Sequence, residues 1–268
     1  MLIEITSFED ERIAAYRNLK DAPLVRSGRF VAEGELVVRT LLECGRHDVE
    51  SILMTASKTA RKDLLELVPE QTPVFAIEPE VMERVAGFPV HRGFLAIGRE
   101  RDRSVEAKTA RGPIVVLEGL SNHDNVGGIF RSAAAFRAGA VWIDDRTADP
   151  LYRKALRVSM GAALRVPWWR APIQGLMAEL SARSFARIAL TPRGEAVPLP
   201  IVSRRVAAER VAILVGAEGP GLTAETLAAA DFWARIPIDP ELDSLNASTA
   251  LAIALYAVNE AKQPLSST

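Results

Sequence analysis

The segment Leu117–Ala138 (LEGLSNHDNVGGIFRSAAAFRA) places an amide, two adjacent glycines and an arginine within a few residues of one another. A buried-looking strand runs into a polar turn that contains Asn125, Gly127 and Gly128, and a helix with Arg131 in its early turns follows. Glycines allow tight backbone geometry, and a helix N-terminus attracts an anion such as an RNA phosphate. The pattern therefore indicates an anion-binding turn, although a helix start with a surface arginine would have the same sequence.

A second segment, Ala212–Leu222 (AILVGAEGPGL), ends a buried strand in a loop with glycines at 216, 219 and 221. Glycines let a ligand approach the main chain. The G-x-x-G-x-G spacing differs from the dinucleotide fingerprint, and no P-loop lysine follows, so a pyrophosphate cofactor is disfavoured. The alternative is a plain strand-to-helix turn that ends at Pro220.

The third segment is Ile236–Tyr256 (IPIDPELDSLNASTALAIALY), in which Ser244, Leu245 and Asn246 precede a strongly apolar helix. Ser244 and Asn246 are both suitable helix caps. One cap needs only one such residue, so the second polar side chain is free to face whatever lies above the loop.

In their order and completeness, these segments resemble the motifs of the SpoU/TrmH family of RNA ribose 2′-O-methyltransferases, within the SPOUT superfamily. The family's first motif, an Asn followed six residues later by an Arg, matches Asn125 and Arg131. The second, GxEGxGL, matches Gly216–Leu222. The third, IP…SLNxS, begins at Ile236 and ends in Ser244–Ser248.

The resemblance covers essentially all of residues 113–262 and includes Asp149–Gly161 (DPLYRKALRVSMG), which is similar to a family segment ending in R-x-S-x-G. One position departs from the family. Relatives usually have Asn where this chain has Ala217, so a side-chain amide is missing from the glycine loop, while main-chain contacts would survive.

The resemblance implies an α/β fold whose C-terminal part is a SPOUT domain with a mostly parallel sheet and a deep trefoil knot, an exception to unknotted topology. Threading would stack the loops at Leu190–Arg193, Gly216–Gly221 and Ile236–Asn246 into one pocket. That pocket would lie at the carboxyl ends of the strands, where ligands favour binding.

The implied activity is methyl transfer from S-adenosylmethionine to a ribose 2′-hydroxyl of tRNA or rRNA, by a cytoplasmic homodimer whose site forms where two knotted domains meet. The family marks Arg131 as catalytic. Because arginine has no acceptor and stays protonated, we expect it to hold a phosphate or stabilise the oxyanion. Asn125, Glu218, Ser244 and Asn246 would orient substrate and arginine. The expected cofactor-binding residues are Leu190, Thr191, Gly216, Ala217, Gly219, Ile236, Ile238, Leu245 and Ser248.

RNA contact outside the site is assigned to basic residues in both parts of the chain. A basic cluster in the C-terminal part is the main candidate, although a solvated helix face would have the same composition. The segments at 30–34 (FVAEG) and 91–93 (HRG) resemble the ribosomal-protein-like RNA-binding domain of many relatives, for which an accessory α/β domain is the alternative. The residues assigned to RNA are Arg29, Arg92, Arg153, Lys154 and Arg157, with Arg165 in the same cluster.

The pattern of elements agrees with this arrangement. Apolar runs at 114–117, 140–143, 187–190, 211–215 and 233–238 alternate with helical segments, which predicts a mostly parallel sheet covered on both faces. A smaller α/β unit precedes it, with runs at 29–33, 36–42, 51–54, 74–77 and 94–98 and a charged helix near 58–67. We therefore predict an RNA-binding domain at 1–100, a polar linker at 101–112 and the methyltransferase domain at 113–268.

Composition excludes several classes of protein. The 268 residues are 49% hydrophobic and 25% charged with net charge −1, which disfavours both disorder and nucleic-acid coating by bulk positive charge. Cys44 is the only cysteine, and His47, His91 and His123 are scattered, so neither a disulfide nor a metal site is expected. The N-terminus lacks an export signal, and the longest apolar stretch, at 250–258, is too short to span a membrane.

Two functions stay open at this point. An active RNA methyltransferase is favoured by the presence of Asn125, Arg131, Glu218, Ser244 and Asn246. Ala217 instead favours a catalytically weak or inactive RNA-binding relative. A nicotinamide-dependent oxidoreductase is disfavoured by the glycine spacing and by the lack of an acidic residue after a first strand-to-helix turn.

Overall fold

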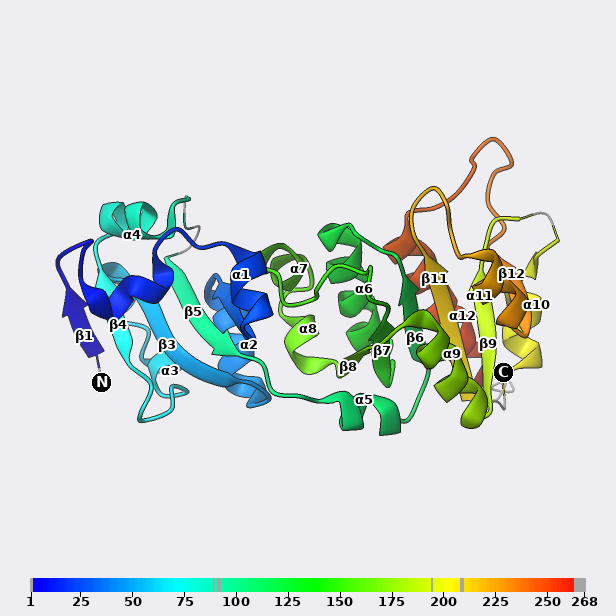
Figure 1. Ribbon diagram of the computed structural model, residues 1–268, viewed down its shortest axis with the longest axis horizontal. Helices are drawn as coiled ribbons and strands as arrows, with labels where there is room; N and C mark the ends of the chain where they lie inside the picture. Colours follow the sequence, from blue (N-terminus) through cyan, green and yellow to red (C-terminus); the bar gives the residue numbers. More distant parts are fainter. Residues whose placement is uncertain (1, 89, 91–92, 194, 208–209, 263–268) are drawn as a thin grey trace, which may run out of the picture. The chain divides into compact units, whose positions relative to one another are not determined.

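The computed structural model describes residues 2–88, 90, 93–193, 195–207 and 210–262, and it divides into two compact units. The first unit comprises residues 1–102 and 149–165, and the second comprises 103–148 and 166–268. Each has its own sheet and its own core (Figure 1).

The first unit is built on a mixed sheet with strand order β1-β4-β3-β5-β2. β1, β4 and β3 run parallel, whereas β5 pairs antiparallel with both β3 and β2. The strands are β1 (Leu2–Ile5), β2 (Arg29–Glu33), β3 (Asp48–Thr55), β4 (Val74–Ile77) and β5 (Phe94–Arg99).

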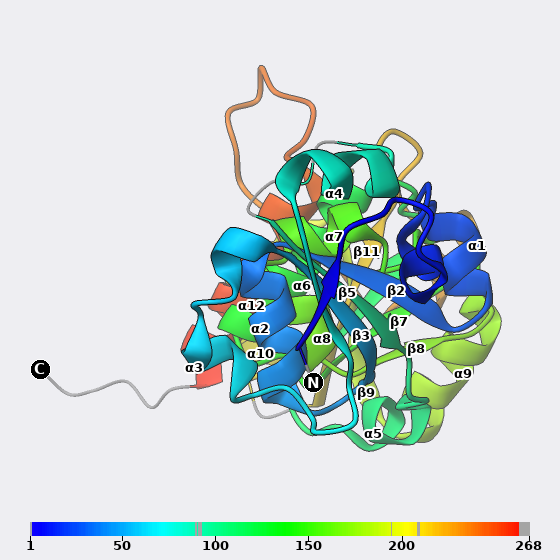
Figure 2. The ribbon, with the colours of Figure 1, turned by 90° about the vertical axis from the view of Figure 1, so that its left-hand side faces the viewer.

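Helices cover both faces of this sheet (Figure 2). On one face, η1, α1 and α4 supply Ile13, Leu24 and Met82 to a core around Val31 and Leu53. α2 contacts β2 and β5, and it includes the apolar run at 36–42, which is therefore helical. The helices are η1 (Glu11–Tyr16), α1 (Asp21–Arg26), α2 (Glu35–Cys44), η2 (Ala56–Lys58), α3 (Lys62–Leu65) and α4 (Pro79–Ala86).

The segment Asp149–Arg165 also packs in the first unit, as helices α7 (Arg153–Val158) and α8 (Ala162–Arg165). Arg153 donates to Asp21 at 3.0 Å. Gly161 lies so close to α2 that a Cβ there would be 2.9 Å from Thr40. The sequence places this segment within one methyltransferase domain at 113–268, whereas its contacts are with residues of the first unit.

The second unit contains an all-parallel sheet with strand order β10-β12-β9-β11-β6-β7-β8. β6 and β7 are buried along their whole length and β11 from Val211 to Val215, as expected when helices cover both faces. The strands are β6 (Ile114–Glu118), β7 (Ala140–Ile143), β8 (Trp168–Arg170), β9 (Phe185–Leu190), β10 (Val197–Pro198), β11 (Arg210–Gly216) and β12 (Phe232–Arg235).

Two helical layers enclose this sheet. Leu176 and Leu227, from α9 and α11, pack with the strand residues Ile114, Val116 and Leu214 in one core cluster. On the other side, α12 contacts α6, α10 and β11. The helices are α5 (Ser104–Thr109), α6 (His123–Ala135), α9 (Ile173–Ala182), α10 (Leu199–Arg205), α11 (Ala224–Ala229) and α12 (Ala247–Lys262).

The predicted α/β class with a parallel C-terminal sheet is confirmed, and the trefoil knot stays a prediction. Within the predicted linker, α5 forms a short helix, with Ala107 buried and its carbonyl accepting from Trp142 Nε1 at 3.1 Å. The run predicted at 233–238 ends as a strand at Arg235, so Ile236 and Ile238 lie in the loop that follows β12.

Candidate active site

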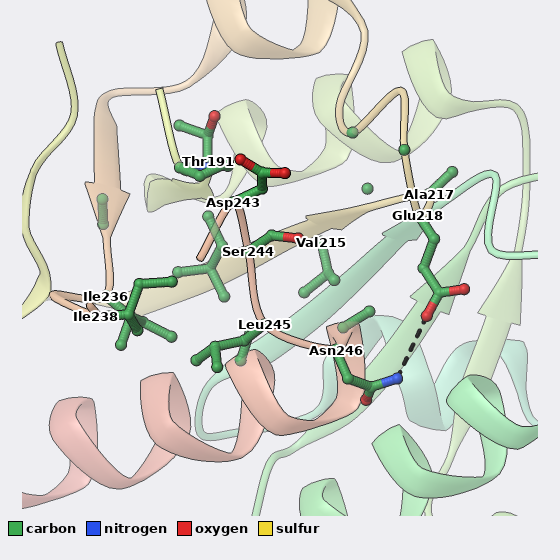
Figure 3. A pocket seen from close by; sticks show the side chains of 18 residues that line it. Thr191, Val215, Ala217, Glu218, Ile236, Ile238, Asp243, Ser244, Leu245 and Asn246 are labelled. Atoms are coloured by element: carbon green, nitrogen blue, oxygen red, sulfur yellow. Dashed lines mark hydrogen bonds between the residues drawn. The ribbon is translucent and has the colours of Figure 1, made fainter. Parts of the chain in front are cut away.

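The loops that follow β9, β11 and β12 project from the same end of the second sheet (Figure 1). Together they enclose a cavity of about 650 Å³, shown in Figure 3. The strands are parallel, so their carboxyl ends meet at this edge, where α/β sheets commonly bind ligands. The lining residues are Leu190, Thr191, Pro192, Val215, Gly216, Ala217, Glu218, Gly219, Gly221, Ala234, Ile236, Ile238, Asp243, Ser244, Leu245, Asn246, Ala247 and Ala250.

The glycine loop begins at Gly216, where β11 ends. A Cβ on Gly216 would be 2.2 Å from the backbone nitrogen of Leu222, so the two ends of the loop approach each other too closely for any side chain. The N–H of Gly221 donates to the carbonyl of Ala217 at 2.9 Å, which closes the loop. Gly219 and Gly221 have φ values of +83° and +72°, which glycine adopts without strain.

A buried carboxylate fixes the far end of this loop, and the sequence analysis missed it. Glu118, the last residue of β6, is 1% exposed and accepts from the Thr223 hydroxyl at 2.8 Å and from its N–H at 3.2 Å. Arg146 lies 3.7 Å from the same carboxylate. An acidic residue that ends an otherwise apolar strand was the available signal, because a buried carboxylate requires such partners.

The first motif lies inside α6, which corrects the expectation that its glycines form the turn before the helix. The helix begins at His123, so Asn125 and Gly128 belong to its first two turns. A Cβ on Gly128 would be 2.9 Å from both Cβ and Oγ of Ser248 on α12. Gly128 therefore allows the two helices to approach closely.

Three motif side chains from separate segments meet at one hydrogen-bonded cluster. Asn125, which is buried, donates from Nδ2 to Glu218 Oε1 at 2.6 Å. Asn246 donates from Nδ2 to Asn125 Oδ1 at 2.7 Å and to Glu218 Oε1 at 3.3 Å. Glu218 and Asn246 line the cavity, and Figure 3 shows the hydrogen bond between them. Asn125 is not among the lining residues and supports the two from α6.

Asn246 is also the residue that caps α12. Its Oδ1 accepts from the N–H groups of Ser248 at 3.0 Å and Thr249 at 3.3 Å, and from the Ser248 hydroxyl at 2.7 Å. Ser244, the other candidate cap, lines the cavity. Ser244, which does not cap α12, is therefore the polar residue of this pair that is left to face the cavity.

The residues expected to bind the cofactor lie together, with one exception. Leu190 ends β9 and Thr191 follows it, while Ile236, Ile238 and Leu245 come from the loop after β12. They line the cavity with the glycine loop. Ser248 is outside the lining, because its side chain is directed to Asn246 and to the surface of α6.

Arg131 is on α6, with an exposed side chain outside the cavity lining. No hydrogen bond or ion pair joins its guanidinium to another residue in the part of the chain that the structure describes. Its donors are accordingly available to a ligand or to a second subunit.

The arginines expected to contact RNA are paired with carboxylates of the first unit. Arg29 lies 2.9 Å from Glu50, Arg157 lies 3.8 Å from Glu33, and Arg165 lies 3.3 Å from Glu43, while Arg153 binds Asp21. Lys154 is exposed, and Arg92 lies outside the described residues. These acidic partners reduce the positive charge that the sequence alone attributes to the cluster.

The described ranges contain neither a candidate membrane span nor a candidate metal site. No helix there is both long and apolar enough to cross a membrane. Among the same residues, no group of three or more His, Cys, Asp or Glu side chains is arranged to hold a metal ion.

More than half of the chain matches a known protein family. Residues 112–256 match the SpoU rRNA Methylase family. The chain belongs to the SpoU rRNA methylase family. The prediction of a SpoU-type RNA methyltransferase is thereby confirmed at the level of the family.

Similarity extends beyond the family segment. An uncharacterized tRNA/rRNA methyltransferase of Mycobacterium tuberculosis is 41% identical over 259 residues, which cover 92% of this chain and 88% of the relative. The crystal structure of an RNA 2′-O ribose methyltransferase is similar with a TM-score of 0.80 and 26% identity, covering 97% of this chain and 99% of the other. An AdoMet-bound rRNA methyltransferase from Sinorhizobium meliloti has the same fold, with a TM-score of 0.83, 22% identity and coverage of 97% and 98%.

Proposed function

We propose that this SpoU-family methyltransferase transfers a methyl group from S-adenosylmethionine to a ribose 2′-hydroxyl in tRNA or rRNA. The observation that carries the proposal is the cluster of Asn125, Glu218 and Asn246 at the wall of the cavity. The cluster brings one residue from each family motif to a single point. The solved RNA 2′-O ribose methyltransferase with the same fold supports the 2′-hydroxyl as the position of transfer.

The cavity suits S-adenosylmethionine in size and chemistry. Its volume of about 650 Å³ falls within the roughly 300–1,000 Å³ typical of small-molecule sites. Ile236, Ile238 and Leu245 offer an apolar surface to the adenine ring, and the main chain of the glycine loop offers N–H and C=O groups to its polar edge. Thr191 and Ser244 supply hydroxyls for the ribose and the methionine end.

When bound, S-adenosylmethionine supplies an electrophilic methyl carbon on a sulfonium, which an oxygen nucleophile attacks in line. The residues of this chain then have the task of alignment, because a displacement of this kind depends on the position of the attacking oxygen. Asn125 and Asn246 restrain the Glu218 side chain, so that the wall of the cavity beside the substrate keeps a fixed shape.

We assign Arg131 to the RNA rather than to proton removal. A guanidinium stays protonated and has no acceptor, so it cannot serve as the base. Its planar donors instead suit a bidentate contact with a phosphate or stabilisation of the developing oxyanion. Its exposed position on α6 supports contact with a group that comes from outside the subunit.

We further propose that two copies form the functional unit. Arg131, Ala134 and Ala135 are exposed on α6, and the contacting helix α12 exposes Ile253 and Tyr256, with 37% and 55% of these side chains accessible. Small and apolar side chains on two packed helices suit an isologous interface. Pairing through this surface would place Arg131 beside the partner's cavity. Light scattering at micromolar concentration should therefore give about twice the monomer mass.

We also propose that basic residues of the first unit contact the RNA. Arg29, Arg157 and Lys154 are the candidates, and ion pairing with Glu50 and Glu33 makes the contribution of Arg29 and Arg157 smaller than their charge suggests. A polyanion can displace the Arg29–Glu50 pair, because a pair that is partly exposed stabilises the protein by only about 1 kcal/mol or less.

Two measurements test the proposed function. Calorimetric titration with S-adenosylmethionine should show saturable binding, and incubation with tritiated donor and bulk tRNA or rRNA should label one RNA class. A ribose-methylated linkage resists alkaline cleavage, so the label should be recovered in alkali-resistant dinucleotides. Label on a base would contradict the proposal. Donor or RNA binding without transfer would identify the chain as the inactive relative that Ala217 favours.

A further inference from the structure

The only charged side chains among the described residues that line the cavity are two carboxylates, Glu218 and Asp243. They come from different loops, Glu218 from the loop after β11 and Asp243 from the loop after β12, and no lysine or arginine joins them in the lining. In the view of Figure 3, the side chain of Asp243 is drawn apart from that of Glu218. The cavity is therefore negatively charged, although its proposed substrate RNA is a polyanion.

The two carboxylates differ in their hydrogen-bond partners. Glu218 accepts from the amides of Asn125 and Asn246. The Asp243 carboxylate has no hydrogen-bond or ion-pair partner in the part of the chain that the structure describes. Asp243 is exposed and its carboxylate has no fixed partner, so it is free to attract a cation that binds in the cavity, with an attraction that solvent weakens.

The proposed methyl donor and its spent product differ in charge. S-adenosylmethionine carries a positive sulfonium, whereas S-adenosylhomocysteine, which forms when the methyl group leaves with its bond broken at sulfur, has a neutral thioether. Adenine, ribose and the amino-acid end are the same in both. Apart from the methyl group itself, the positive charge is therefore the only feature by which a protein can distinguish them.

We propose that Asp243 is a specificity-determining residue that favours the charged donor over the neutral product. The inference rests on the proposed function, because it takes the cavity as the donor site. Asp243 contributes a favourable Coulomb interaction with the sulfonium that disappears once the methyl group has been transferred. The product then leaves more readily, and fresh donor displaces it.

The test compares dissociation constants by calorimetry for three ligands: S-adenosylmethionine, S-adenosylhomocysteine and sinefungin, which has an ammonium in place of the sulfonium. Asp243→Asn removes the charge with little change of shape. Because an exposed charge pair contributes about 1 kcal/mol or less, we expect the variant to bind both cationic ligands about two- to fivefold more weakly. Its affinity for S-adenosylhomocysteine should stay within a factor of about two.

Glu241→Gln is the matched control, because Glu241 is an exposed carboxylate on the same loop but outside the cavity lining. It should leave all three constants unchanged. The wild-type protein offers a second measurement that needs no variant: raising the salt concentration should weaken binding of the cationic ligands and leave the neutral product unaffected.

An equal loss for all three ligands would overturn the inference, because Asp243 would then hold a group that they share, such as a ribose hydroxyl or the amino group. A salt-independent preference in the wild type would overturn it as well. If the wild-type protein binds none of the three ligands, the proposed function itself fails, and this outcome is distinct from the other two.

Discussion

The side chains of Asn125 and Glu218 are hydrogen-bonded at 2.6 Å although 93 positions separate them in the chain. Asn125 is buried on α6, and Glu218 is exposed at the cavity wall. The bond therefore connects helix α6 to the glycine loop. The position of the loop depends on an amide donor at residue 125.

Replacing Asn125 by Asp tests this dependence. The variant loses the N–H donor and places a second carboxylate beside Glu218, and the two like charges repel. We expect turnover to fall about 100-fold, as for a catalytic group displaced by about 1 Å. Single-turnover methylation measures the loss. Asp124→Asn, at the exposed neighbour, is the control and should retain normal rates.

Arg131→Lys tests the bidentate role of the guanidinium. Lysine keeps the charge and loses the planar fork, so we expect turnover to fall about 100- to 1,000-fold. Because the side chain is exposed, the free energy of unfolding should change by less than about 0.5 kcal/mol. Near-normal turnover in this variant would refute the bidentate contact.

Gly128→Ala tests the close approach of α6 to α12. The added methyl group would lie 2.9 Å from the Ser248 side chain, so we expect a loss of about 1–3 kcal/mol in the free energy of unfolding, measured with urea. Ser248→Gly removes the opposing atoms. The double variant should therefore be more stable than Gly128→Ala alone, and a purely additive result would exclude the contact as the cause.

Glu118→Gln tests the carboxylate that holds the exit of the glycine loop. Glu118 accepts two hydrogen bonds from Thr223, and an amide would turn an NH₂ group toward one of these donors. We expect a loss of about 1–3 kcal/mol in stability. We also expect weaker binding of S-adenosylmethionine in calorimetry. Glu225→Gln, an exposed change on α11, should affect neither quantity.

Asp231 gives a prediction about pH. Hydrogen bonds from the Arg187 guanidinium lower the pKa of the Asp231 carboxyl below its usual value of 3.8. A group whose pKa is lower in the folded state stabilises the protein above its unfolded pKa, and this stability is lost as pH falls through the folded pKa. Asp231→Asn should therefore cost about 1 kcal/mol at neutral pH, and the difference from the wild type should shrink only below about pH 4. A difference that shrinks already between about pH 7 and 5 would assign the effect to another group.

The sequence predicted the fold well where apolar runs are continuous. The strands at 74–77 and 140–143 begin and end where expected, because buried parallel strands show no polar alternation. The edge strand at Trp168–Arg170 was missed because it is short and half-buried. The apolar residues Ile236 and Ile238 were predicted to lie in a strand. In the structure they follow the strand, and their apolar side chains line the cavity.

The sequence motifs were sufficient to predict many of the residues that form the candidate site. Asn125, Glu218 and Asn246 are motif residues, but their mutual bonds depend on the path of the chain and cannot be inferred from spacing. The same limit explains why Glu118 was missed, since its partner Thr223 is 105 positions away. Asp243 is one acid among several in its loop, and only its position in the cavity lining distinguishes it.

The segment Asp149–Arg165 leaves the second unit after β7, packs with the first, and returns before β8. Neither unit is consequently an uninterrupted stretch of polypeptide. A fragment that starts at residue 103 would carry Leu151, Leu156 and Leu164, which are buried in the intact protein, without the partners that cover them. Truncation at one position therefore cannot produce either unit complete. During synthesis, the first unit can finish folding only after α7 and α8 have been made.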